Sequence, residues 1–158
     1  MKASEFASLI PECCSEVLDA MYFTTMLGSE RVEAIPLNSL DATAALAFSL
    51  RFAGDVSGDF GLYLEQATAR SLAANFLGVE EADVSSGEIG EVAGELANML
   101  CGSVVSRVEG EHKFVLSHPE RVNTPLREDL ADVLISRLDT DAGAITVWIS
   151  VEGVPCCL

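Results

Sequence analysis

The stretch SSGEIGEVAGELANMLCGSVVSRV, residues 85–108, decides the fold. Its apolar side chains recur every three or four residues, which is the spacing of a helix with one buried face. Ser85 and Glu88 have the S-x-x-E spacing of a capping box, in which the hydroxyl and the carboxylate each bind an otherwise unpaired backbone N–H. We therefore expect a long helix over about residues 86–108. Its buried face would consist of Ile89, Val92, Ala93, Leu96, Met99, Leu100 and Val104.

Helices and hairpins are expected on both sides of this helix. Apolar periodicity predicts a helix over about residues 4–22, in which Pro11 either makes a kink or marks the first true turn. Residues 31–37 are ambiguous and could form an edge strand. The other expected elements are a hairpin of strands 44–52 and 58–65, a helix over 66–77 ended by Gly78, a strand over 112–117, a loop over 122–129 and a hairpin of strands 132–138 and 144–152.

The order of elements repeats half-way along the chain. ECCSEVLDAM, residues 12–21, aligns without gaps on EVAGELANML, residues 91–100, at an offset of 79 residues. Ten residues of amphipathic helix can align by chance, but the hairpins that follow come in the same order, which favours a duplication with pseudo-repeats of about 1–79 and 80–158. We expect one α+β domain over residues 1–158, a mainly antiparallel sheet with two long helices packed on one face.

Charge and composition argue against some binding partners and indicate where the protein is expected to be found. The chain has 25 acidic and 9 basic side chains, for a formal net charge of −16, so neither nucleic acid nor an anionic membrane is an expected partner. No targeting segment is visible, and no uncharged apolar run reaches the ~18 residues of a membrane span, so a cytoplasmic location is expected. The five cysteines, in two adjacent pairs and a lone Cys101, do not form a disulfide pattern and are expected to be reduced.

A polar stripe runs beside the apolar face of the 86–108 helix. Glu91, Glu95 and Asn98 stand at positions i, i+4 and i+7 and so share one side, and Glu88 extends the stripe by a turn. Such a stripe is often only a solvated helix face. However, like charges at i and i+4 repel by about 0.2–0.5 kcal/mol, and no Lys or Arg alternates with these carboxylates. The stripe is therefore the candidate site.

The candidate site contains a recognisable signature. Glu95-Leu96-Ala97-Asn98 is an E-x-x-N sequence on the second long helix, and it resembles the signature of the CheC/CheX/FliY phosphatases of bacterial chemotaxis, CheX most of all. In that family the signature reads Asp or Ser, three residues, Glu, two residues, Asn, and a proline some twenty residues later. Glu95, Asn98 and Pro119 match it, whereas Glu91 stands where Asp or Ser is expected. The first long helix has Asp19 in place of the asparagine, so the chain carries a single copy.

The resemblance implies a phosphatase acting on the aspartyl phosphate of a CheY-type response regulator. Asn98 would orient the attacking water and Glu95 would anchor the lysine of the receiver domain, with Glu91 and Pro119 as supporting residues. The resemblance also implies that this chain binds no metal or cofactor, that Mg²⁺ is held by the partner receiver, and that the protein is a homodimer joined through sheet edges.

Two alternatives remain open beside the phosphatase. One is a non-catalytic CheC-like or FliN-like module that binds a response regulator or a flagellar motor component. The other is a divalent metal site made of Glu88, Glu91 and Glu95, which is less favoured because a straight helix cannot wrap three carboxylates around one ion. No Ser/His or Cys/His mechanism is supported, since His112 and His118 flank a strand without a nucleophile beside them.

The single tryptophan has a structural interpretation. Trp148 is expected on the strand face of Thr146 and Ser150, opposite the apolar face of the same strand, as a half-covered packing contact or a sheet-edge contact.

Overall fold

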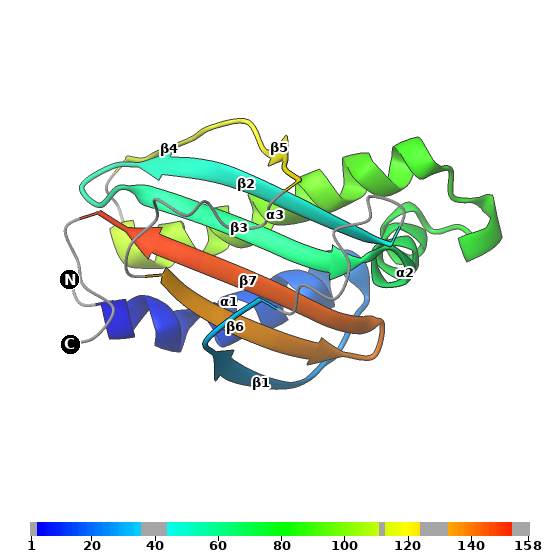
Figure 1. Ribbon diagram of the computed structural model, residues 1–158, viewed down its shortest axis with the longest axis horizontal. Helices are drawn as coiled ribbons and strands as arrows, with labels where there is room; N and C mark the ends of the chain where they lie inside the picture. The colour runs from blue at the N-terminus through cyan, green and yellow to red at the C-terminus, as the bar shows by residue number, and fades with distance from the viewer. Residues whose placement is uncertain (1–2, 36–43, 111–112, 124–132, 153–158) are drawn as a thin grey trace.

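The computed structural model describes residues 3–35, 44–110, 113–123 and 133–152, and it shows three long segments of helix lying against one sheet (Figure 1). In chain order the elements are α1 (Ala3–Tyr22), β1 (Met26–Val32), β2 (Ala45–Ala53), β3 (Gly58–Glu65), α2 (Gln66–Leu77), the 3-10 turn η1 (Glu81–Asp83), α3 (Ser86–Glu109), β4 (Val115–Leu116), β5 (Glu120–Arg121), β6 (Val133–Thr140) and β7 (Gly143–Val151). The expected α+β class, with α1 and α3 on the same face of an antiparallel sheet, is confirmed.

The seven strands of the described residues follow the order β1-β6-β7-β3-β2-β4, with β5 also paired to β2. Both expected hairpins, β2 with β3 and β6 with β7, are present, and they meet at the centre of the sheet through β3 and β7. In the two halves of the chain, β1 corresponds to β4, β2 to β6 and β3 to β7. Exchanging each strand for its counterpart gives the same order, read from the opposite edge of the sheet. A duplication would produce this order, and the duplication itself stays a prediction.

Side chains alternate between the two faces of the sheet, as the period of a strand requires. Phe48 and Phe52 of β2 point towards the helices and join the main core, whereas Ala45 and Ala47 of the same strand belong to a smaller apolar cluster on the opposite face. Trp148 lies in that second cluster, on the predicted face, and at 2% exposure it is covered more fully than expected.

The helix ends follow local sequence signals. The Glu88 N–H donates to Ser85 Oγ over 3.1 Å and the Ser85 N–H donates to Glu88 Oε1 over 3.0 Å, so the predicted capping box begins α3. Gly78 ends α2 with a φ of 70°, a left-handed conformation that glycine adopts without strain. α1 continues through Pro11, which therefore lies inside the helix and does not mark its first turn.

The strands at the two edges differ from the expectations. The predicted edge strand at 31–37 is found as Met26–Val32, where most side chains are exposed and main-chain pairing with β6, not an alternating apolar pattern, defines the strand. The strand predicted at 112–117 is reduced to Val115–Leu116, and β5 forms at Glu120–Arg121, where no strand was predicted. The predicted loop at 122–129 and the cysteines at 156 and 157 lie largely or wholly outside the described residues.

Candidate functional site

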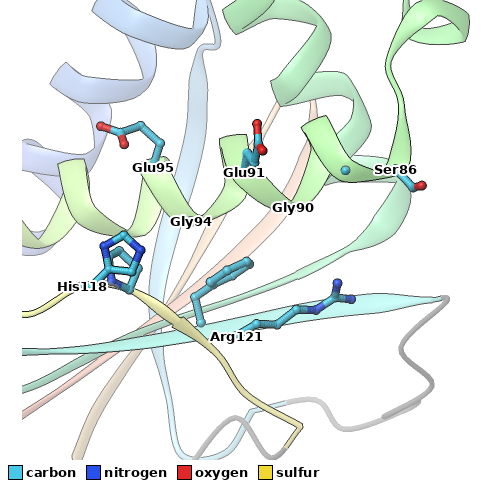
Figure 2. A pocket seen from close by; sticks show the side chains of 10 residues that line it. Ser86, Gly90, Glu91, Gly94, Glu95, His118 and Arg121 are labelled. Atoms are coloured by element: carbon cyan, nitrogen blue, oxygen red, sulfur yellow. The ribbon is translucent and has the colours of Figure 1, made fainter.

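α3 presents the predicted stripe on the side turned away from the core. Leu96 and Ala97 are fully buried, while Glu91 and Glu95 are exposed and Asn98 is half-buried at the edge of the exposed side. Figure 2 shows Glu91 and Glu95 projecting from the same side of the helix. The spacing seen in the sequence therefore places the two carboxylates and the carboxamide along one line of a rigid helix.

The acidic pairs of the two long helices have different partners. On α1, Glu12 Oε1 lies 3.4 Å from Arg107 Nη1, and Glu16 Oε2 lies 3.0 Å from Arg107 Nη2, so both carboxylates pair with one guanidinium of α3. The corresponding Glu91 and Glu95 on α3 have no basic partner among the residues that the structure describes. Within the described residues, the two pairs therefore differ in that only the pair on α1 has a basic partner.

A buried tyrosine joins α1 to α3 next to Glu95. Tyr22 is fully buried, its hydroxyl lies 3.9 Å from Met99 Sδ, and its ring stacks on Phe76 with centroids 5.0 Å apart. Burial, and to a smaller extent the nearby Glu95 carboxylate, raises the pKa of Tyr22 well above its usual range. The tyrosine therefore stays neutral and holds the two helices together at this level.

A groove of about 430 Å³ lies between α3 and the segment 118–121 (Figure 2). Glu91, Glu95 and Pro119 all line it, so the structure brings together three of the four predicted site residues. Asn98, about one helical turn beyond Glu95, is not among the residues that line the groove.

The far side of the groove is fixed to the sheet by backbone hydrogen bonds. The Ser117 N–H donates to the Arg51 carbonyl over 2.8 Å, and the Val122 N–H donates to the Ala47 carbonyl over 2.9 Å. The Arg51 N–H also donates to Ser117 Oγ over 2.7 Å. The segment that carries Pro119 is therefore attached to β2 at both of its ends.

Three of the groove residues outside α3 were not predicted from the sequence as site residues. Phe48 of β2 is one of the lining residues, and His118 and Arg121 lie on the side opposite α3 (Figure 2). In the sequence, His118 was interpreted only as a residue beside a strand. Its position next to Pro119, a predicted site residue, was the signal that could have placed it in the site. The segment 118–121 lies beside α3 because it pairs with β2, and the spacing of residues in the sequence does not show this pairing.

The structure gives no support to the metal alternative. Glu88 is occupied by the capping box, where its hydrogen bonds to Ser85 lower the pKa of its carboxyl. Within the four described ranges, no group of three His, Cys, Asp or Glu side chains is arranged to hold a metal ion. None of the helices in the described part of the chain combines the length and the apolar character that crossing a bilayer requires.

Residues 46–128, more than half of the chain, match the family model described as chemotaxis phosphatase CheX. The chain belongs to the CheX family. The CheX match spans all of α3 and the segment after it, so it includes Glu91, Glu95, Asn98 and Pro119. No curated protein matches the chain in sequence.

Solved structures of the CheX type share the fold of this chain. The chemotaxis protein CheX from Desulfovibrio desulfuricans is 16% identical, with a TM-score of 0.69 over 94% of this chain and 99% of that one. A CheC-like superfamily protein from Shewanella sp. PV-4 is 17% identical, with a TM-score of 0.71 over 97% and 100% of the two chains. The CheX-CheY-BeF3-Mg²⁺ complex from Borrelia burgdorferi is 18% identical, with a TM-score of 0.66 over 92% and 97%.

Proposed function

We propose that this chain binds a CheY-type response regulator and hydrolyses its aspartyl phosphate. The observation that carries the proposal is the E-x-x-N stripe on α3, whose exposed carboxylates have no basic partner in the described part of the chain. Membership of the CheX family supports the same activity. The Borrelia burgdorferi structure is a CheX-CheY-BeF3-Mg²⁺ complex, which supports a CheY-type receiver as the partner here.

The reaction would break the bond between phosphorus and the aspartyl carboxylate oxygen. A water molecule attacks the phosphorus in line with that bond, and the products are inorganic phosphate and a free aspartate. Mg²⁺, expected on the partner receiver and not on this chain, would neutralise the phosphoryl oxygens. The contribution required of this chain is therefore to position the water and to hold the two proteins in register.

Asn98 suits the first task because its carboxamide can accept a hydrogen bond from water and donate one to a second group without titrating. It stands half-buried on a helix, so few of its rotamers need to be lost on docking. A water molecule that such a group holds at attack distance from the phosphorus has already lost its translational freedom. The entropic part of the activation barrier to hydrolysis is therefore lower.

Glu95 suits the second task. It lies about one helical turn from Asn98 and is exposed, so it can make a charge-assisted hydrogen bond to a lysine of the receiver. Glu91, one turn further back, would add to the same attraction. Pro119 would support the site by limiting the backbone of the segment across the groove.

The test is the rate at which a phosphorylated CheY-type receiver loses its phosphate. The wild-type chain is expected to accelerate the loss, and Asn98→Ala is expected to lower that acceleration by about 100-fold or more, because the water is no longer positioned. Asp19→Ala, at the corresponding place on α1, is the matched control and should act like the wild type. A wild-type chain without effect, or an Asn98→Ala variant with full effect, would contradict the proposal.

A non-catalytic binding module, like CheC or FliN, is the second candidate function. It is favoured by Glu91, which replaces the Asp or Ser of the family signature. Binding of the phosphorylated receiver without faster loss of phosphate would identify this function.

We further propose that the chain forms a homodimer through sheet edges. β1 is an edge strand, paired only with β6 among the described strands, and Leu27 on it is 69% exposed. Sedimentation equilibrium would show a mass of twice that of the chain, and a monomer mass at all concentrations would contradict the dimer.

A further inference from the structure

Another hollow lies beside α2, and no residue of the E-x-x-N stripe lines it. This α2 hollow, of about 450 Å³, is formed by the end of α1, the last turns of α2 with the chain that follows, and the turn between β6 and β7. Its volume is within the range of about 300–1,000 Å³ that is usual for binding sites. The lining residues on which its chemistry depends are Phe23, Ser71, Val79, Glu80, Glu81 and Asp141.

Phe23, which lines the α2 hollow, has two properties that do not stabilise the fold. It is 75% exposed, although burial of an aromatic ring is favourable. Its φ is 48°, in the left-handed region, which is costly for a bulky side chain. At the end of α2 the left-handed position is taken by Gly78, the residue that such helix ends ordinarily use. A strained and exposed phenylalanine is better explained by a contact with another molecule than by the folding of this chain.

The backbone that carries Phe23 is fixed in place. Thr24 is fully buried, its N–H donates to the Leu18 carbonyl over 3.0 Å, and its Oγ1 donates to the Tyr22 carbonyl over 2.8 Å. Asn75 of α2 donates to Thr24 Oγ1 over 3.3 Å and so ties this turn to α2. An aromatic residue on a fixed turn loses little conformational entropy when a partner binds.

Carboxylates stand on two sides of the α2 hollow, and hydrogen bonds locate them. On one side, Ser71 Oγ donates to Glu81 Oε1 over 2.6 Å, which holds that carboxylate over α2. On the other side, the Thr25 N–H donates to Asp141 Oδ1 over 3.1 Å, which holds that carboxylate beside the chain that follows α1. Glu80 is exposed and also lines the hollow.

These three carboxylates are not neutralised within the described part of the chain. Among the described residues that line the hollow, none is Lys, Arg or His. None of the three acids forms an ion pair with a described basic residue. The nearby Arg70 guanidinium donates to the carbonyls of Glu81 and Val84, over 2.9 Å each, and does not line the hollow. The α2 hollow therefore suits a cation that also has a flat face for an aromatic ring.

We propose that the α2 hollow is a docking site for an arginine side chain of a partner protein. A guanidinium is planar, so it can stack on the Phe23 ring while its N–H groups donate to carboxylates on both sides. The ammonium of lysine would pair with the carboxylates but has no plane to stack. The proposal does not depend on the proposed function, because it uses no residue of the E-x-x-N stripe.

The first experiment tests the chemistry of the site. N-acetyl-L-argininamide is added to the full chain, and its Kd is measured from the backbone amide resonances in nuclear magnetic resonance spectra. Saturable shifts are expected for residues 23–25, 79–81 and 141–142. N-acetyl-L-citrullinamide has a similar shape without the charge and should cause no shifts, and N-acetyl-L-lysinamide should bind at least about twofold more weakly. Absent shifts, or equal binding of either control compound, would overturn the proposal.

The second experiment separates contact from folding at Phe23. Phe23→Gly is expected to raise the melting temperature, because glycine adopts the left-handed φ without strain. The same variant is expected to raise the Kd for N-acetyl-L-argininamide by about twofold or more, because the stacking surface is lost. Val115→Gly removes an apolar side chain that is 70% exposed outside the hollow and should leave the Kd unchanged. A lower melting temperature or an unchanged Kd for Phe23→Gly would assign the ring to the fold and overturn the proposal.

The third experiment removes one charge. Asp141→Asn keeps the oxygen that accepts from the Thr25 N–H and is expected to raise the Kd for the same probe by about two- to fivefold. Glu5→Gln, at the other end of α1, changes the net charge equally and should have little effect. If the two variants change the Kd equally, only the net charge attracts the probe and the docking site is refuted.

Discussion

Arg107 Nη2 lies 3.0 Å from Glu16 Oε2, so the last turns of α3 are tied to the middle of α1 by an ion pair. The same guanidinium reaches Glu12. All three side chains are 40% or more exposed, and exposed ion pairs contribute about 0–1 kcal/mol. Arg107→Ala should therefore leave the midpoint of urea denaturation almost unchanged. A large fall of the midpoint would show that the pair is a main support of the helix packing.

The same ion pair predicts that α1 is a poorer docking site for a receiver than α3. Asp19→Asn would complete an E-x-x-N sequence on α1 with Glu16, but Glu16 already pairs with Arg107. In an Asn98→Ala background, Asp19→Asn is expected to leave the dephosphorylation rate of the receiver close to that of the Asn98→Ala variant alone. A recovered rate in this double variant would show that the ion pair does not prevent docking at α1.

The capping box makes part of the stability of α3 depend on pH. Hydrogen bonds to Ser85 lower the pKa of Glu88 below its ordinary value of 4.5. A lowered folded-state pKa gives stability that is fully present above the unfolded pKa and is lost as the pH falls through the folded one. Glu88→Gln should therefore lower the melting temperature at pH 7 and have a diminishing effect below about pH 4. An effect that stays constant down to pH 2 would contradict the role of the carboxylate.

Ser85 contributes to the same cap at all pH values. Ser85→Ala removes the hydroxyl that accepts from the Glu88 N–H and should cost about 1 kcal/mol of stability in urea denaturation at pH 7. Ser86→Ala, at the neighbouring exposed position, is the control and should cost less.

The three described cysteines are expected to be unreactive in the folded protein. Cys13, Cys14 and Cys101 are free and buried, and burial raises the pKa of each, that of Cys101 to about 12. The thiolate is the reactive form, so little of it exists at pH 8. With Cys156 and Cys157 replaced by serine, a chromogenic disulfide reagent at pH 8 should label the chain only after unfolding. Rapid labelling of the native variant would show that these thiols are accessible.

Elements with local signals could be predicted from the sequence. The capping box and the apolar period located α3, and Gly78 located the end of α2. The edge strands were placed less well, because β1, β4 and β5 are defined by pairing with residues far away in the chain.

The candidate site could be predicted only where it is local. Spacing along one helix was enough to align Glu91, Glu95 and Asn98. The groove could not be predicted, since it forms only when the segment of His118 returns to α3 over β2. The ion pairs of Arg107 with Glu12 and Glu16 likewise join two helices, and the sequence of one helix alone does not predict them.

Trp148 is the single tryptophan of the chain, and the sheet separates it from α3. Its indole is packed against Gly61, where any side chain would overlap the ring. The emission of Trp148 therefore reports the packing of the outer sheet face, against which Val122 also packs. Unfolding exposes this buried indole and is expected to shift its emission, so the protein carries a built-in optical measure of its own integrity.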